Sequence, residues 1–134
     1  MCIKGTGVDI IEIERIKKVV SSSNKFVSRV YTNSEIEYFN SRNSNPCHLA
    51  GTFAAKEAVL KALGTGLRDM DWKDIEIKRN SLGKPIVVLH GNAVVLANSL
   101  GIKKMHISIS HSRDYAIAQA TAEGGDEDEE CINF

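Results

Sequence analysis

Long apolar runs, aromatic residues and paired cysteines are all scarce in this 134-residue sequence. No run approaches the ~20 apolar residues that a membrane-spanning helix needs, so we do not expect the chain to cross a membrane. Aromatic residues make up 6% of the chain and the basic residues are dispersed, a pattern that gives nucleic-acid binding little support. The three cysteines are far apart and form no C-x-x-C pair, so neither a disulfide framework nor a zinc site is predicted.

Known nucleotide-binding loops are also missing, although G-T-G occurs twice, at residues 5–7 and 64–66. Neither copy is followed by the residues of a Walker loop or completes G-x-G-x-x-G, so a P-loop or Rossmann site is not predicted. The glycines still let a backbone or a ligand approach closely. The sequence has no internal repeat and no linker, and its length suits one domain that buries roughly two thirds of its unfolded surface.

Charge is unevenly distributed, although the formal net charge is zero. Five acids occupy residues 126–130, which leaves 17 basic and 12 acidic residues elsewhere, a net charge of about +5 that favours an anionic ligand or partner. We expect a folded domain over residues 1–122 and an acidic, disordered tail over residues 123–134. No signal-peptide core is visible, so a cytoplasmic location is expected, or a plastid-like organelle interior if a transit peptide was removed.

Hydrophobic periodicity predicts one α+β domain in which helices cover one face of a mainly antiparallel sheet. Residues 25–32 are too short and mixed in character to assign. Elsewhere the pattern predicts strands and helices in the order strand 3–13, helix to about residue 20, helices 33–40 and 46–63, strands 72–79 and 86–90, helix 91–100, and two strands within 104–122 around a turn near residues 112–114. The third helix begins at a proline, and T-x-x-E at residues 32–35 forms a capping box for the second.

The helix that contains "FAAKEAVLKALGTG" (residues 53–66) carries charges among apolar residues. Glu57 and Lys61 are four residues apart, so one interpretation is an ordinary surface pair worth ~0.2–0.5 kcal/mol. Alternatively, the helix is buried, because it is apolar on nearly every side, and Glu57 and Lys61 belong to a functional site. Lys56 has no evident partner, and we expect it to extend to solvent at the edge of the helix.

Asp9 is the second conspicuous charge, because it stands in "GVDIIEI", a segment with the composition of a central strand. It either caps a turn or the following helix, for which aspartate is well suited, or it faces a site from the end of a strand. Two carboxylates and a lysine are what a hard cation and a polyphosphate require, because carboxylates supply oxygen ligands to Mg²⁺ and lysine offsets phosphate charge. Asp9, Glu57 and Lys61 therefore suggest a magnesium and phosphate site.

The segment "MHISIS" places His106, Ser108 and Ser110 on one face of a predicted strand, opposite three apolar residues. This polar face is either exposed to solvent or part of a site. His111 is five residues after His106, so the two imidazoles point to opposite faces of a regular strand. That spacing argues against a metal site formed by two histidines.

Four segments taken together closely resemble the holo-acyl-carrier-protein synthase family of the 4′-phosphopantetheinyl transferase superfamily. They are "GTGVDIIEIERI", "FAAKEAVLKALGTG", "DIEIKRNSLGKP" and "HISISHSRDYAIAQA", and the resemblance extends from Gly5 to about Ala122. It implies the phosphopantetheinyl transferase fold and a trimer with sites between subunits. It also implies an enzyme of fatty acid biosynthesis that moves the phosphopantetheine arm of coenzyme A onto a serine of apo acyl carrier protein and releases adenosine 3′,5′-bisphosphate.

The resemblance also implies roles for individual residues. Asp9 and Glu57 match the ligands of Mg²⁺, for which Mn²⁺ is an alternative, and Glu57, Lys61 and His106 match the catalytic residues. Coenzyme A contacts are implied for Lys61, Gly64, Gly66, Gly83, Lys84, Pro85, His106, Ser110 and His111. Contacts with the acidic carrier protein are implied for Arg15, Lys25 and Arg29, which are otherwise plain surface charges.

Three questions remain open at this level. Many relatives have arginine where this chain has Thr52, so a nucleotide phosphate contact is either missing or supplied elsewhere. The proton of the attacking serine goes to Glu57, to a metal-bound water or to His106. Two other functions compete with the transferase: a non-catalytic module that binds coenzyme A or a carrier protein, and a Mg²⁺-dependent nucleotide hydrolase.

Overall fold

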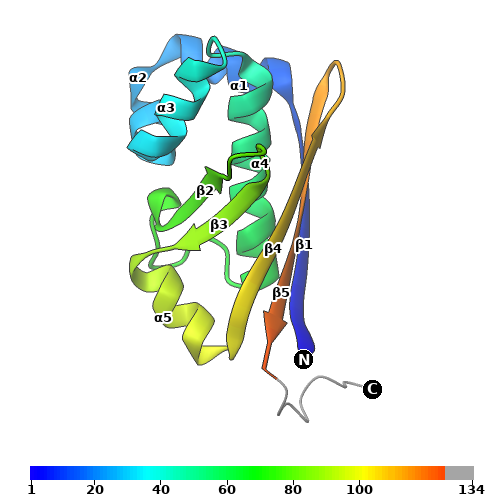
Figure 1. Cartoon of the computed structure of the whole chain (residues 1–134). Coiled ribbons are helices and arrows are strands. Elements are labelled where there is room, and N and C mark those ends of the chain that lie inside the picture. Colours follow the sequence, from blue (N-terminus) through cyan, green and yellow to red (C-terminus); the bar gives the residue numbers. More distant parts are fainter. Residues whose placement is uncertain (126–134) are drawn as a thin grey trace.

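The computed structural model describes residues 1–125. These residues form two antiparallel sheets and five α-helices (Figure 1). In order, the elements are β1 (Cys2–Glu12), α1 (Ile13–Ser22), α2 (Asn24–Val30), α3 (Asn33–Ser41), α4 (Pro46–Leu63), the 3₁₀ helix η1 (Trp72–Asp74), β2 (Ile75–Arg79), β3 (Pro85–Leu89), α5 (Gly91–Ser99), β4 (Ile102–His111) and β5 (Tyr115–Gly124). No helix among these residues is long and apolar enough to span a membrane.

The main sheet has three antiparallel strands in the order β1-β5-β4, and α4 packs along one of its faces (Figure 1). We call this covered side the inner face and the opposite side the outer face. Helices α1–α3 lie at one end of α4 and α5 lies near the other, while β2 and β3 pair in a small antiparallel sheet of their own. The predicted α+β class, with helices on one face of an antiparallel sheet, is confirmed.

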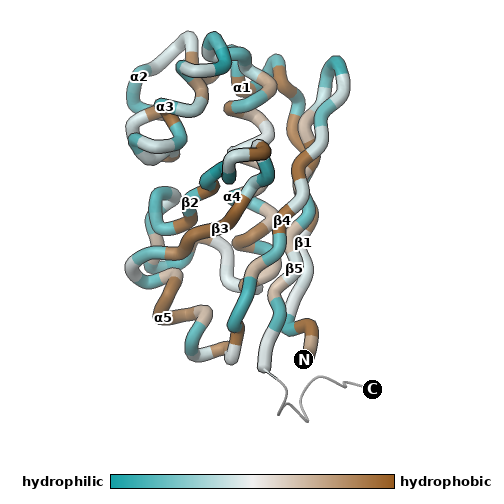
Figure 2. Tube along the Cα trace, viewed as in Figure 1, coloured by the Kyte–Doolittle hydropathy of each residue, from teal (hydrophilic) through white to brown (hydrophobic). Residues whose placement is uncertain are grey.

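Helix α4 is the centre of the core, because its side chains are buried on nearly every side. It begins at Pro46 as predicted, after the Asn45 side chain accepts a hydrogen bond from the backbone N–H of Cys47. It ends at Gly64, whose φ of 82° is the left-handed conformation that glycine adopts without strain. The hydropathy of the chain follows this arrangement, with a hydrophilic tip on the β4–β5 hairpin, far from the core (Figure 2).

Gly5 and Gly7 allow β1 to lie directly against α4. A Cβ atom built on Gly5 would lie 2.1 Å from the carbonyl oxygen of Ala62, and one on Gly7 would lie 2.0 Å from that of Ala58. Real Cβ atoms do not approach backbone oxygen so closely, so any larger residue would push the strand away from the helix. The G-T-G at residues 5–7 was expected to let a backbone or a ligand approach closely; what approaches it is the backbone of α4.

Three local expectations differ from the structure. The unassigned residues 25–32 form most of α2, whose cap is the Ser23 side chain accepting from the backbone N–H of Lys25. The predicted strand 72–79 begins only at Ile75, because Asp71 and Asp74 close a 3₁₀ turn in front of it. Strand β5 continues to Gly124, so residues 123 and 124 belong to the sheet and not to the tail. Residues 126–134 lie outside the described part of the chain.

The expectation that Lys56 extends to solvent is wrong. Its side chain is fully buried and its Nζ lies 2.8 Å from Oε1 of Glu35, the glutamate of the predicted capping box. The ammonium also donates to the backbone carbonyls of Val30 and Ile75, both at 2.8 Å, and of Trp72 at 3.1 Å. Burial lowers the pKa of Lys56, and Glu35 opposes that shift. The pair joins α2, α3, α4 and the start of β2.

Candidate active site

Asp9, Glu57 and Lys61 meet where β1 packs on α4. Nζ of Lys61 lies 3.3 Å from Oδ1 of Asp9 and donates to the backbone carbonyl of Val8 at 2.9 Å. Asp9 is part of β1 and does not cap the following helix, since the N-cap position of α1 is Glu12. Within residues 1–125, the ion pair of Lys61 is with Asp9 and not with Glu57, which rules out the ordinary helix pair.

The two carboxylates of this group repel each other. Burial raises the pKa of Glu57, the charge of Asp9 raises it further, and Lys61 acts in the opposite direction. A divalent cation would remove this repulsion. No group of three or more His, Cys, Asp or Glu side chains suited to a metal occurs in residues 1–125, so the protein offers two carboxylates here. That donor set fits Mg²⁺, which keeps several waters and takes phosphate oxygens when it binds.

A pocket of about 400 Å³ opens beside these three side chains. Arg15 of α1 lines it, so this predicted carrier-protein contact lies at the edge of the candidate site. The rest of the wall is apolar and comes from β1, α1, α2 and α4: Ile10, Ile11, Ile16, Val19, Phe26 and Phe53. The pocket can therefore accept a ligand with a charged end and an aliphatic part. Sequence reasoning missed Phe26, which lies in the segment that could not be assigned.

A second group of predicted residues lies where β3 approaches β4. Lys84, Pro85 and His106 line a pocket of about 410 Å³ there, together with Lys103 and Lys104, which the sequence analysis did not select. Gly83 has a φ of 84° in the preceding turn, where the Asn80 side chain accepts from the backbone N–H of Lys84 at 2.9 Å. Nε2 of His106 lies 2.6 Å from Oε2 of Glu123. The available signal in the sequence was the pair of adjacent lysines at the start of β4.

One chain does not bring the two groups together. Asp9 pairs with Ala118, a buried residue of the inner face. The predicted alternation in β4 is confirmed: Ile107 and Ile109 pack against the core, whereas His106 and its polar neighbours are exposed on the outer face. His106 therefore lies on the opposite side of the sheet from Asp9 and α4.

The remaining predicted residues are dispersed. Lys25 and Arg29 are exposed on α2, as a carrier-protein contact requires. Ser110 and His111 are exposed at the end of β4, and Gly66 has a φ of 64° with open space around it. Thr52 is 2% exposed and so offers a ligand no polar contact.

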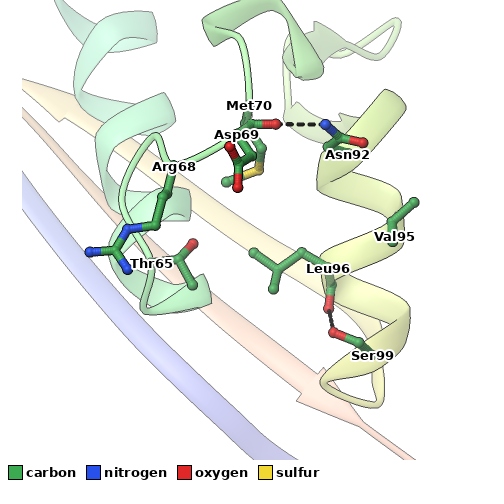
Figure 3. Close-up of a pocket in the computed structure, with 8 residues that line it drawn as sticks. All are labelled: Thr65, Arg68, Asp69, Met70, Asn92, Val95, Leu96 and Ser99. Carbon is green, nitrogen blue, oxygen red and sulfur yellow. Dashed lines mark hydrogen bonds between the residues drawn. The ribbon is translucent and has the colours of Figure 1, made fainter.

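A larger pocket, of about 590 Å³, lies between the loop after α4 and helix α5 (Figure 3). Asn92 of α5 donates to the backbone carbonyl of Asp69 at 2.6 Å and ties the two segments together. None of the predicted site residues lines this pocket, although Thr65 lies between Gly64 and Gly66. Its size alone does not make it the active site.

Comparison with known proteins agrees with this geometry. A family model described as the 4′-phosphopantetheinyl transferase superfamily matches residues 5–120. A holo-[acyl-carrier-protein] synthase of Alkaliphilus oremlandii is 54% identical over 120 residues, covering 90% of this chain and 98% of the relative.

Solved structures extend the comparison. The acyl carrier protein synthase of Plasmodium yoelii with ADP bound superposes with a TM-score of 0.83 at 37% identity, over 92% of this chain and 97% of that one. A Bacillus anthracis holo-(acyl-carrier-protein) synthase in complex with CoA (3′,5′-ADP) superposes with a TM-score of 0.77 at 35% identity, over 93% of this chain and 100% of that one. As its four motifs predict, the chain belongs to the 4′-phosphopantetheinyl transferase superfamily.

Proposed function

We propose that this protein is a Mg²⁺-dependent holo-acyl-carrier-protein synthase. It transfers the 4′-phosphopantetheine group of coenzyme A to a serine of apo acyl carrier protein and releases adenosine 3′,5′-bisphosphate. The observation that carries the proposal is the meeting of Asp9, Glu57 and Lys61 beside a pocket with apolar walls. This arrangement suits a substrate that joins a pyrophosphate to an aliphatic arm.

Asp9 and Glu57 are the residues that would hold Mg²⁺, or Mn²⁺ in its place. When bound, the ion would neutralise the negative charge that builds up on the pyrophosphate. The support for this assignment is that the charge of Asp9 raises the pKa of Glu57, so that the metal-free protein holds two repelling carboxylates.

Lys61 is placed to bind the pyrophosphate directly. Its ammonium has three N–H donors, of which one bonds to Val8 and one to Asp9. Its side chain is 54% exposed, so the third donor is free to reach a phosphate oxygen in the pocket. The bonds to β1 fix the direction of the side chain before the substrate arrives, which lowers the cost of ordering it.

The proton of the attacking serine requires an acceptor in the same pocket. Glu57 lines this pocket and is one candidate acceptor, and a water held by the metal is another. His106 of the same chain lies on the outer face, bonded to Glu123, so it cannot take this role at the site of its own chain. On the carrier side, we assign Arg15, Lys25 and Arg29 to contacts with the acidic acyl carrier protein.

A trimer with sites between subunits is part of the proposal. The outer face of the sheet exposes a group of apolar side chains: Val8 (54% exposed), Ile10 (60%), Tyr115 (47%) and Ile117 (40%). A face of this kind is typical of a subunit interface. Contact between chains would also bring the pocket between β3 and β4 of one subunit, which Lys84 and His106 line, to the Asp9 and Glu57 of another, and so complete the coenzyme A site.

The Ile117→Lys variant tests the trimer. The new charge lies on the middle strand of the sheet, within this apolar group, so we expect the mass measured by sedimentation equilibrium to fall from that of three chains to that of one. The unfolding temperature at low protein concentration should change little. Val95→Lys on α5, where the side chain is 65% exposed, is the matched control and should leave the mass unchanged. A wild-type chain that sediments as a monomer would contradict the proposal.

One assay separates the proposed function from its competitors. The protein is incubated with apo acyl carrier protein, coenzyme A and Mg²⁺, and the carrier is weighed by mass spectrometry. We expect a gain of one phosphopantetheine group. Cleavage of coenzyme A without a change in the carrier would indicate a hydrolase, and binding without either reaction would indicate a non-catalytic module.

A further inference from the structure

A group of lysines lies near the end of the main sheet where β1 and β4 begin and β5 ends (Figure 1). Lys103 and Lys104 are exposed on β4, and they line the pocket between β3 and β4 together with Lys84, which directly precedes β3. Lys4 of β1 is also close, since a Cβ atom built on Gly124 would lie 2.5 Å from its Cε. We call Lys84, Lys103 and Lys104 the lysine cluster.

The lysine cluster carries three positive charges that no acid of the described residues neutralises. Within residues 1–125, none of its members takes part in an ion pair. Glu123 pairs with Lys104 in the sheet, but its Oε2 lies 2.6 Å from Nε2 of His106. Three exposed ammonium groups around one pocket attract an anion, because a bound negative charge reduces the repulsion among them.

The acidic run of this chain begins beside these lysines. Strand β5 ends at Gly124, which pairs with Ile102 of β4, and a Cβ atom built on Gly125 would lie 3.9 Å from Cε of Lys103. The five residues that follow in the sequence are all acidic: Asp126, Glu127, Asp128, Glu129 and Glu130. Because five residues span at most about 17 Å, every one of these acids is connected to the lysine cluster by a short length of chain.

The short connection strengthens the attraction between the acids and the lysines. One exposed ion pair contributes little to binding, because water and salt screen it. Here several acids face three lysines, and the connection through Gly125 gives them an effective concentration in the millimolar range. The acidic run also lies outside residues 5–120, the part that matches the superfamily model, so it can serve a purpose that the shared fold does not require.

We propose that residues 126–130 bind to the lysine cluster of their own chain and compete there with the phosphate groups of coenzyme A. The acidic run is then an inhibitor within the chain, which a high concentration of coenzyme A displaces. The competition rests on the proposed function, because Lys84 and His106 of this pocket are assigned to the coenzyme A site. The contact between acids and lysines does not depend on transfer activity, and inorganic pyrophosphate is the anion used to measure it.

The first experiment compares the full-length wild type with an amide variant that carries five changes: Asp126→Asn, Glu127→Gln, Asp128→Asn, Glu129→Gln and Glu130→Gln. The backbone NMR signals of Lys103 and Lys104 should differ between the two proteins at low salt and coincide at about 1 M NaCl, where the Debye length is only ~3 Å. The amide variant should bind inorganic pyrophosphate about 3- to 10-fold more tightly. The control variant, Glu14→Gln with Glu37→Gln, loses exposed acids of α1 and α3 and should behave as the wild type.

Replacing two lysines distinguishes direct contact from a change in net charge. In chains with Lys103→Gln and Lys104→Gln, neutralising the acids should change the affinity for pyrophosphate by less than about 2-fold, because both sets of charges act through one contact. An equal effect in both backgrounds would overturn the proposal. It would also be overturned if the lysine signals of the wild type matched those of the amide variant at low salt.

A labelling experiment identifies the chain that supplies the acids. Isotope-labelled chains of the amide variant are mixed with unlabelled wild-type chains, and the labelled signals of Lys103 and Lys104 should stay unchanged. A shift of these signals toward the wild-type positions would show that the acids come from another chain, and would overturn binding within one chain.

The last experiment tests the competition with coenzyme A in the transfer assay. At low salt, the amide variant should have a KM for coenzyme A about 3- to 10-fold below that of the wild type, with an unchanged kcat. Equal KM values, in proteins whose lysine signals still differ, would overturn the competition. Absence of transfer by both proteins would contradict the proposed function and would leave the NMR and pyrophosphate results as they are.

Discussion

Glu57→Gln is expected to reduce phosphopantetheine transfer by about 10²–10³-fold without unfolding the protein. The amide cannot provide the charge that holds the metal, and it cannot accept the proton of the carrier serine. The loss should appear as a fall in kcat at saturating Mg²⁺, measured by mass spectrometry of the carrier. Glu14→Gln, on the exposed surface of α1, is the matched control and should transfer at the wild-type rate.

The same substitution should stabilise the metal-free protein near pH 7. The pKa of Glu57 is raised in the folded state, first by burial and then by Asp9, so its ionised form opposes folding at pH values above that pKa. The neutral amide removes this repulsion, and the unfolding temperature of the variant should therefore be higher than that of the wild type. As the pH falls through the raised pKa, Glu57 becomes protonated in the folded state and the difference should begin to shrink; it should vanish below the ordinary pKa of glutamate, where the unfolded chain is protonated as well. A variant that keeps full transfer activity would refute the role of Glu57.

Lys56→Met should lower the free energy of unfolding by about 3–5 kcal/mol, measured by urea denaturation. The Glu35 side chain is 1% exposed, so removing Lys56 leaves its carboxylate buried without a counter-ion. The carbonyls of Val30 and Ile75 lose a donor as well. Because small domains are stable by only about 5–15 kcal/mol, this loss is a large part of the total.

A double variant distinguishes the buried charge from the loss of packing. Adding Glu35→Gln to Lys56→Met removes the uncompensated carboxylate, so the double variant should be more stable than the sum of the single effects predicts. Lys73→Met, at an exposed position, should change the free energy of unfolding by less than about 0.5 kcal/mol. A Lys56→Met protein as stable as the wild type would show that the buried pair does not support the fold.

Lys56 also shows where sequence reasoning fails for this fold. Periodicity correctly predicted that α4 is buried nearly all round, and the T-x-x-E pattern correctly predicted the start of α3. Neither pattern indicates that Glu35, 21 residues before Lys56, is buried against α4 and forms an ion pair with the Lys56 ammonium. A local pattern identifies a helix cap, but the partner of a buried ion is set by tertiary packing.

The candidate site was predictable to a similar extent. Asp9 was conspicuous because an unpaired carboxylate is costly to bury in an apolar strand, and the structure places it beside Lys61. The alternation of β4 correctly assigned His106 to a polar face. It could not indicate that this face lies on the other side of the sheet from Asp9, because alternation defines two faces and does not specify which one α4 covers.

The two glycines of β1 have a consequence for the acids of the site. Since Gly5 and Gly7 hold the strand in direct contact with the backbone of α4, Asp9 is the next inward-facing residue of β1 and begins very near the helix. For the Mg²⁺ that we propose between Asp9 and Glu57, an acid with a short side chain is sufficient, and a longer one would have to fold back on itself. The separation between strand and helix therefore selects aspartate over glutamate at this position. A homologue with larger residues in place of the glycines would need a wider gap and a longer acid to span it.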